Sequence, residues 1–289
     1  MQGLKRIGFY LLLNFLVVMM LSVILYFVPM PRSQTLSLLI FCAIFGFAGS
    51  FISLALSKFM AKRVYKLQMI DANTPDARAR FLYDTVAQMA RHEGIAMPEV
   101  GIYPSPDVNA FATGASKNKA LMAFSVGLLE RLSEDEIAAV AGHEMTHIVQ
   151  GDMVSMTLVM GLVNTFVLFA ARIVASVLDS ALRGDSGRGG LGYLGYYLVV
   201  ILLQNVLMLL AMIPVSYYSR YREYRADQGA AELTGAGSMI SALQKIEQYY
   251  KVDKKQDSFA LAKINSKSKT SIFATHPSVV DRIERLRSI

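Results

Sequence analysis

The stretch His143-Glu144-Met145-Thr146-His147 determines how the rest of the chain is interpreted. In a helix, residues i and i+4 lie one turn apart on one face, so both imidazoles can point at one atom. Glu144 projects toward the same space at a different angle, where it can reach a water held by that atom. The stretch therefore predicts a divalent-metal site on a helix.

The surrounding residues place this stretch well inside a helix. Ser133 and Glu136 have the S-x-x-E spacing of a capping box, which satisfies free backbone N–H groups at a helix start. Apolar residues then recur at helical spacing, and no proline interrupts them before Gly151. The alternative, two histidines that only face a partner helix, is disfavoured by the spacing, the glutamate and the cap. Because H-E-x-x-H on a helix is typical of zinc peptidases, we expect one zinc ion per chain.

The composition predicts a membrane protein. Hydrophobic residues make up 54% of the chain and charged residues only 18%. A transmembrane helix needs about 20 apolar residues, and four tracts without charge predict spans near 7–28, 36–57, 154–177 and 193–215. We expect membrane helices in 1–57 and 153–215, and two parts of one catalytic region in 58–152 and 216–289.

Charge distribution predicts the orientation of these spans. Basic residues are concentrated before span one, after span two and after span four, whereas Arg32 is the only one in the first short loop. Both termini and the segment between spans two and three are therefore expected in the cytoplasm. The net charge of +7 fits attraction to anionic lipid, and no basic and aromatic module for nucleic acid is visible. The lone Cys42 excludes a disulfide framework.

A candidate third metal ligand follows the fourth span. Glu223 and Asp227 are spaced i and i+4, so their carboxylates share one face of a helix leaving the bilayer. At about 1.5 Å per residue, Glu223 stands about 13.5 Å beyond Pro214, and His147 lies about 12 Å from Ser155. Two antiparallel spans would bring both to one level, completing the His2Glu set that catalytic zinc favours. A solvated helix with i,i+4 ion pairs would explain the charges, but it would not explain why Glu223 and His147 stand at nearly the same distance from the membrane.

Local patterns predict the other cytoplasmic elements. Runs at 100–103, 108–113 and 120–124 are favourable for strands and are separated by proline and glycine turns, which predicts a small sheet. Residues 229–250 are expected to form a further amphipathic helix, and the polar stretch 251–270 a loop or mobile cover. A final helix is expected to start at His276-Pro277, with Thr275 as its cap.

Taken together, these motifs resemble the HtpX family of membrane-bound heat-shock zinc proteases, which is related to the type I CAAX prenyl endopeptidases. The resemblance covers nearly the full length. It is carried by the H-E-x-x-H stretch, by two pairs of spans, by Glu223-Tyr224-Arg225-Ala226-Asp227 and by Asn109-Ala110-Phe111-Ala112. It implies a mainly helical, gluzincin-like zinc peptidase domain with a small sheet, set on four transmembrane helices of a bacterial inner membrane.

The resemblance also implies roles for single residues. His143, His147 and Glu223 would bind zinc, Glu144 would be the catalytic base, and Asp227 would orient a zinc-bound histidine, as chemistry also favours. Residues Asn109, Ala110, Phe111 and Ala112 resemble a substrate-facing edge strand that can pair with an extended peptide. His276 resembles a histidine near the scissile carbonyl, although a helix-start residue is an equally good interpretation.

We therefore expect a zinc metalloendopeptidase that cleaves damaged or misfolded membrane proteins in a stress response. Two alternatives stay open: a protease for prenylated or otherwise lipidated tails, and a non-catalytic membrane scaffold with a structural zinc. The CAAX enzymes carry additional spans around a chamber, which disfavours the first. A structural site needs a fourth protein ligand, and only His92 and His276 are spare. The sequence does not identify substrates, oligomeric state or regulation.

Overall fold

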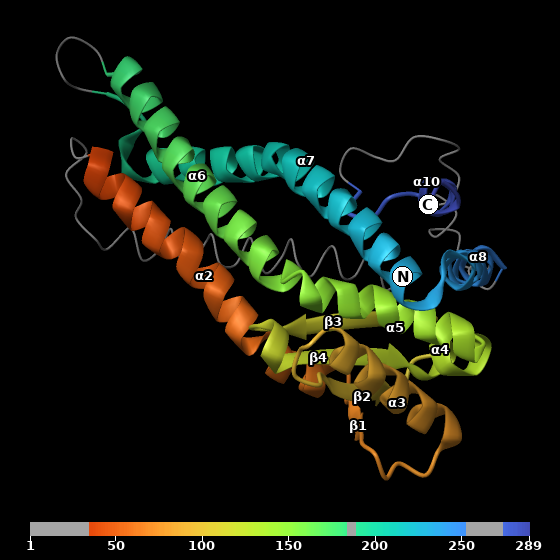
Figure 1. The fold of residues 1–289 in the computed structure, drawn as a ribbon. Helices are drawn as coiled ribbons and strands as arrows, with labels where there is room; N and C mark the ends of the chain where they lie inside the picture. Colours follow the sequence, from red (N-terminus) through yellow and green to blue (C-terminus); the bar gives the residue numbers. More distant parts are fainter. Residues whose placement is uncertain (1–34, 184–188, 253–273) are drawn as a thin grey trace. The chain divides into compact units, whose positions relative to one another are not determined.

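The computed structural model describes residues 35–183, 189–252 and 274–289 (Figure 1). In this part the chain is mainly helical with one four-stranded sheet, as the sequence predicts. The predicted span 7–28 and most of the predicted cover 251–270 lie outside the described residues. The chain divides into two compact units, one of Met1–Ile52 with Thr157–Val215 and one of Ser53–Met156 with Ser216–Ile289.

The first unit is built from apolar helices. Among the described residues, three helices are long and apolar enough to cross a membrane: α2 (Thr35–Val64), α6 (Asp152–Ala181) and α7 (Gly192–Thr234). They include the predicted spans 36–57, 154–177 and 193–215. Helices α2 and α6 pack closely at glycine, since a Cβ on Gly46 would lie 2.5 Å from Oγ1 of Thr165. Small residues of this kind let helix backbones approach within a membrane.

The second unit contains the sheet. Its strands are β1 (Gln68–Ile70), β2 (Glu99–Tyr103), β3 (Ala110–Gly114) and β4 (Ala120–Ser125), in the order β1-β2-β4-β3. Strands β2 and β4 are parallel, and the other two pairs are antiparallel. The three predicted strands are present, but β1 was not predicted because its three residues carry no alternating pattern. Strand β3 pairs with β4 alone among the described residues and forms an edge of the sheet.

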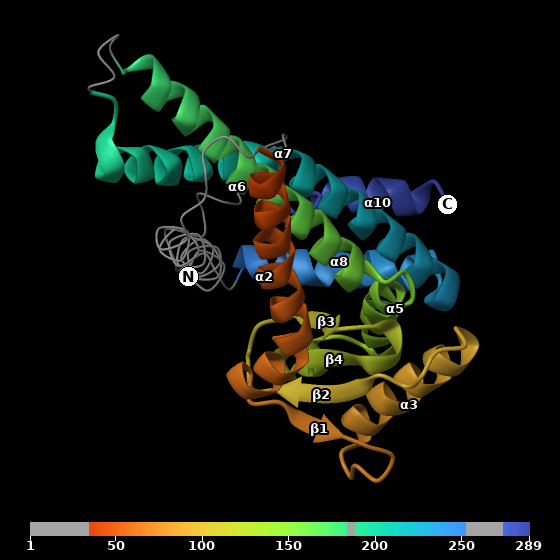
Figure 2. The same ribbon diagram turned by 90° about the vertical axis from the view of Figure 1, so that its left-hand side faces the viewer.

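Two helices pack against one face of this sheet. Helix α3 (Ala77–His92) and helix α5 (Glu134–Val149) contribute buried side chains to a core shared with the strands, among them Leu82, Val86, Met122, Phe124 and Met145. Helix α5 also contacts β3, which lies beside it in Figure 2. Tyr65, Tyr103 and Phe111 form a cluster of aromatic rings 4.8 to 5.9 Å apart. A short unpredicted helix, α4 (Val126–Arg131), joins β4 to α5 and is capped by Ser125.

Two helix boundaries differ from the sequence-based expectation. Helix α7 continues to Thr234 and ends at Gly235, whose φ of +88° suits glycine, so α8 (Ala236–Val252) begins later than the predicted helix 229–250. Helix α10 (Val279–Arg287) is capped by Ser278, whose Oγ accepts a hydrogen bond from the Asp281 N–H, and not by Thr275. Helices α5 and α6 are separated at Gly151, which has a φ of +68°.

Candidate metal centre

Helix α5 presents both histidines on one face. Its start has the predicted capping box, with the Ser133 hydroxyl accepting from the Glu136 N–H and the Glu136 carboxylate accepting from the Ser133 N–H. The helix is continuous through His143 and His147, whose ring centroids lie 4.8 Å apart with nearly perpendicular planes. The two imidazoles therefore face a common space from adjacent turns.

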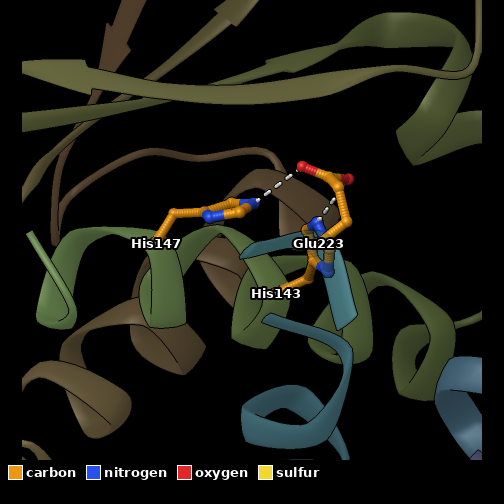
Figure 3. A group of neighbouring side chains, drawn as sticks. All are labelled: His143, His147 and Glu223. Carbon is orange, nitrogen blue, oxygen red and sulfur yellow. Dashed lines mark ion pairs between the residues drawn. The ribbon is translucent and has the colours of Figure 1, made fainter. Parts of the chain in front are cut away.

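Glu223 of α7 enters this space from a distant part of the sequence (Figure 3). One carboxylate oxygen lies 3.4 Å from Nε2 of His147 and the other 3.7 Å from Nε2 of His143. Glu223 is buried, and the two histidine side chains are only 9% and 12% exposed. The sequence-predicted ligands are thus brought together, and Glu223 lies beyond the apolar part of α7, which ends at Val215.

Small residues allow α7 to lie this close to α5. A Cβ on Gly229 of α7 would lie 2.4 Å from Oγ1 of Thr146 on α5, well inside normal contact. One turn earlier on α5, a Cβ on Gly142 would lie 3.3 Å from Cα of Ala230. Larger side chains at these points would separate the two helices that carry the histidines and the carboxylate.

Each histidine is held at its other ring nitrogen by a buried carboxylate. Nδ1 of His143 lies 3.0 Å from Oδ1 of Asp227, the residue predicted to orient a histidine. Arg282 of α10 donates two hydrogen bonds to Asp227, at 2.7 and 2.5 Å. Nδ1 of His147 lies 2.6 Å from Oδ2 of Asp152, the first residue of α6. Both Nε2 atoms are consequently directed toward Glu223.

The geometry fits a zinc ion. The three ligand atoms all lie within 4.8 Å of one another, and this is the only such group of metal-ligating side chains in the part of the chain that the structure describes. Ligands about 2.0 to 2.2 Å from a tetrahedral zinc lie roughly 3.3 to 3.6 Å apart. Oε1 of Glu223 lies 3.4 Å from Nε2 of His147, within this range, and Oε2 lies 3.7 Å from Nε2 of His143. Two histidines and one glutamate are also a ligand set of catalytic zinc.

The electrostatics of the pocket favour a positive charge between these side chains. Burial alone would lower the pKa of His147, but its contacts with Asp152 and Glu223 raise the pKa to about 9. Burial alone would raise the pKa of Glu223, yet contacts with His147 and His276 hold it well below its ordinary value. A divalent cation would supply the positive charge that this pocket stabilises.

Two further predicted residues lie at the same site. Glu144 is half-buried on α5, and its carboxylate has no hydrogen bond or ion pair with the described residues, so it is available to a water molecule. His276 precedes α10, and its Nδ1 lies 2.9 Å from Oε2 of Glu223. That contact raises the pKa of His276 above its ordinary value. His276 does not form the metal-ligating group with the other three side chains.

The predicted substrate-facing residues lie at the edge of the sheet. Ala110, Phe111 and Ala112 belong to β3, and Asn109 immediately precedes it. Ala110 and Ala112 pack against the core, whereas the ring of Phe111 packs against Tyr103 on the opposite face. The Asn109 side chain donates a hydrogen bond to the Tyr103 hydroxyl at 3.0 Å. These contacts fix the strand while leaving one backbone edge without a partner strand among the described residues.

The sequence did not predict that Asp152, Arg222 and Arg282 lie around this site. Arg282 is on α10, far from the motif in sequence, and no spacing rule connects them. Asp152 follows His147 by five residues, which in a continuous helix would rotate it about 140° away at 3.6 residues per turn. The only signal in the sequence for the position of Asp152 was the glycine that precedes it, at the end of the helix with the H-E-x-x-H stretch.

Comparisons with known proteins show the family of this chain. Residues 76–289 match the model of Peptidase family M48. The chain is 45% identical to Protease HtpX of Shewanella halifaxensis (strain HAW-EB4) over 287 residues, which cover 98% of this chain and 99% of that protein. Protease HtpX of Shewanella baltica (strain OS195) gives the same identity and coverage.

The fold also resembles a solved structure. The crystal structure of S. mikatae Ste24p matches with a TM-score of 0.62 and 18% identity, covering 86% of this chain and 58% of that one. The present chain thus spans just over half the length of Ste24p, and at this identity the likeness concerns the fold alone. Three findings therefore agree: the family match, the 45% identity to bacterial proteases over nearly the full length, and the apolar helices. They show that the chain belongs to peptidase family M48 and is a membrane metalloprotease.

Proposed function

We propose that this metalloprotease is a zinc-dependent endopeptidase that hydrolyses peptide bonds in damaged or misfolded membrane proteins. The observation that carries the proposal is the buried convergence of His143, His147 and Glu223 from two helices. This ligand set leaves a position open for water or substrate, as catalytic zinc sites do and structural sites do not.

The chain's own residues would then divide the chemistry. His143, His147 and Glu223 would hold one zinc ion, which when bound lowers the pKa of a water and polarises a carbonyl. Glu144 would accept the proton of the attacking water and return it to the leaving amine. Asp227, held by Arg282, would keep His143 oriented with Nε2 toward the metal.

The edge strand supports an extended peptide as the substrate. Among the described residues β3 pairs only with β4, so its other edge offers backbone N–H and C=O groups with which a peptide can pair main chain to main chain. Such pairing involves no side chain of the substrate, so it would accept many sequences. Residues Asn109, Ala110, Phe111 and Ala112 would form the docking strand, and its contact with α5 would bring the peptide near the histidines.

His276 would act on the substrate and not as a permanent metal ligand. Its side chain is 69% exposed and touches Glu223 through Nδ1. An exposed imidazole at this point could donate a hydrogen bond to the carbonyl oxygen as negative charge develops on it. His276→Ala would then lower kcat while leaving zinc content unchanged.

We further propose a multi-pass inner-membrane protein with both termini and the metal centre in the cytoplasm. Basic residues at the end of α2, among them Lys62 and Arg63, support this orientation. The resemblance to heat-shock proteases supports a stress-response role. Cysteine labelling of single-cysteine variants in intact cells, with Cys42 replaced, would test the orientation: a label on residue 116 that requires membrane permeabilisation supports it.

The central experiment compares the purified chain with Glu144→Gln in detergent. We expect one zinc per chain in both, cleavage of casein and of an unfolded membrane protein by the native chain, and a loss of at least about 100-fold in the variant. Glu134→Gln, an exposed glutamate in the first turn of the same helix, is the matched control and should retain activity. Full activity of Glu144→Gln would refute the mechanism.

The sequence resemblance to a family related to the type I CAAX prenyl endopeptidases keeps a lipidated-tail protease as the second candidate. The same assay separates the two if a prenylated peptide is included. Cleavage of the prenylated peptide alone would favour the second candidate. A tightly bound zinc with four protein ligands and no cleavage of any substrate would favour a non-catalytic scaffold.

A further inference from the structure

The environment of His147 contains a second orienting relay beside the one on His143. Oδ2 of Asp152 lies 2.6 Å from Nδ1 of His147, and the Asp152 side chain is only 3% exposed. Since a carboxylate can only accept, the Nδ1–H of His147 donates, and the lone pair of a neutral imidazole is then on Nε2. That is the nitrogen 3.4 Å from Glu223, where the metal would sit.

Asp152 reaches His147 because the helix breaks between them. Five residues further along an unbroken helix, a side chain points about 140° away. Gly151 adopts a φ of +68°, a left-handed conformation that separates the end of α5 from the start of α6. The first side chain of α6 can therefore turn back onto the histidine in the last turn of α5.

Arg222 balances the buried carboxylate. Its Nε lies 3.3 Å from Oδ2 of Asp152 in an ion pair, and its Nη1 donates a hydrogen bond to the Asp152 backbone oxygen at 3.4 Å. The Arg222 side chain is 13% exposed. A buried charge without a partner is strongly unfavourable, and Arg222 places an opposite charge beside the Asp152 carboxylate. Arg222 immediately precedes Glu223, so one turn of α7 supplies both a metal ligand and this cation.

The two relays have the same chemical order. His143 contacts Asp227, which accepts two hydrogen bonds from Arg282, and His147 contacts Asp152, which forms an ion pair with Arg222. In each, an arginine lies beside a buried carboxylate that contacts a histidine, although the Nε of Arg222 has no hydrogen-bond partner among the described residues. The repetition on both histidines argues against an incidental ion pair at Asp152.

We propose that Asp152 is the positioning residue of His147 and that Arg222 positions Asp152. The proposal rests on the metal-binding function of His147 proposed above and adds to it the groups that set the orientation of this ligand. Partners of this kind typically change metal affinity by about 10- to 100-fold. We expect Asp152→Ala to lower zinc affinity within that range. Asp152→Asn should have a smaller effect, because an amide oxygen can still accept from Nδ1, and Arg222→Gln should resemble Asp152→Asn.

The test is a zinc titration of the full-length apoprotein in detergent against a chromophoric chelator, with the visible spectrum of the cobalt(II)-substituted protein as a second readout. The spectrum reports ligand geometry, which a general loss of stability would not change. Asp84→Asn, an exposed carboxylate on α3, is the control and should match the native protein. Each apoprotein is also unfolded thermally to compare stability.

The outcomes distinguish this proposal from the proposed function. Weaker zinc binding in the order Asp152→Ala, then Asp152→Asn, with altered cobalt spectra and an unchanged control, supports the relay. Native affinity and spectrum in Asp152→Ala overturn it. If Asp152→Ala does not fold, the near-isosteric Asp152→Asn decides, and native behaviour there also overturns the relay. Failure of the native chain to bind zinc would instead refute the metal centre itself.

Discussion

The close approach of α7 to α5 can be perturbed at Gly229, where one added methyl group has no room. A Cβ at this position would lie 2.4 Å from Oγ1 and 2.5 Å from Cγ2 of Thr146. Non-bonded heavy atoms prefer about 3.5 to 4.0 Å, so Gly229→Ala must separate the helices by about 1 Å. Thr146 cannot turn aside, because it is buried and β-branched.

This displacement reaches the proposed metal ligands because Glu223 lies on the same helix, six residues and about 9 Å from Gly229. Moving it by 1 Å would lengthen the 3.4 Å separation from Nε2 of His147 to roughly 4.4 Å, too long for two ligands of a tetrahedral zinc. We expect zinc affinity to fall at least about 10-fold and activity about 100-fold. Overpacking should lower the free energy of unfolding by about 1 to 3 kcal/mol.

Zinc affinity is measured by chelator competition and stability by denaturant titration in detergent. Thr146→Ala removes Oγ1 and Cγ2, so the double variant Gly229→Ala/Thr146→Ala should recover most of the lost affinity, with a coupling energy of about 1 kcal/mol or more. Gly237→Ala on α8, where a Cβ would meet nothing within 4 Å, is the control. Native zinc affinity in Gly229→Ala, or a double variant no better than the single one, would refute the reasoning.

Three other predictions each concern a single residue. Burial alone would raise the pKa of Glu136, but hydrogen bonds from Lys245, Ser241 and the Ser133 backbone lower it to about 2. The resulting stability is about 2 kcal/mol after allowing for the half-exposed Lys245. It is present above about pH 4.5 and lost as the pH falls toward 2, so thermal unfolding of Glu136→Gln should match that of the native chain only at about pH 2 and below. Gly151→Ala should lower the free energy of unfolding by about 1 to 2 kcal/mol through its left-handed φ alone, and equal stability in denaturant titration would contradict this. Gly46→Ala should lower the free energy of SDS-driven unfolding by about 1 to 3 kcal/mol, since its Cβ would lie 2.6 Å from the Thr165 backbone nitrogen. If the variant resisted SDS as well as the native chain does, α2 and α6 would be able to separate freely.

The features that sequence predicts here depend on strong local signals. The apolar tracts, the capped helix with His143 and His147, and the paired acidic residues Glu223 and Asp227 each follow a fixed spacing or a long uniform composition. The prediction that Glu223 lies near the histidines required only the rise per residue along two helices, counted from the ends of their apolar tracts. Assignments of this kind do not depend on how side chains pack.

The features that sequence does not predict depend on tertiary packing. Gly229 and Gly235 are both plausible helix breaks, yet Gly229 stays helical as a contact point with Thr146 while Gly235 takes the left-handed conformation. Similarly, Asp152 becomes a partner of His147 only because the chain turns at Gly151. The competing caps Thr275 and Ser278 are chemically equivalent, and the fold selects the second.

The edge of β3 that has no partner strand among the described residues would also influence how substrates are selected. A peptide paired with this strand, which spans Ala110–Gly114, must be fully extended over about five residues. In an intact membrane protein such residues are hydrogen-bonded within helices, and they become extended only when the segment opens locally. Each 1.4 kcal/mol of opening free energy reduces the open population about tenfold. Damage that weakens a segment by about 3 kcal/mol would thus speed its cleavage by roughly 100-fold, although the protease never recognises the lesion itself.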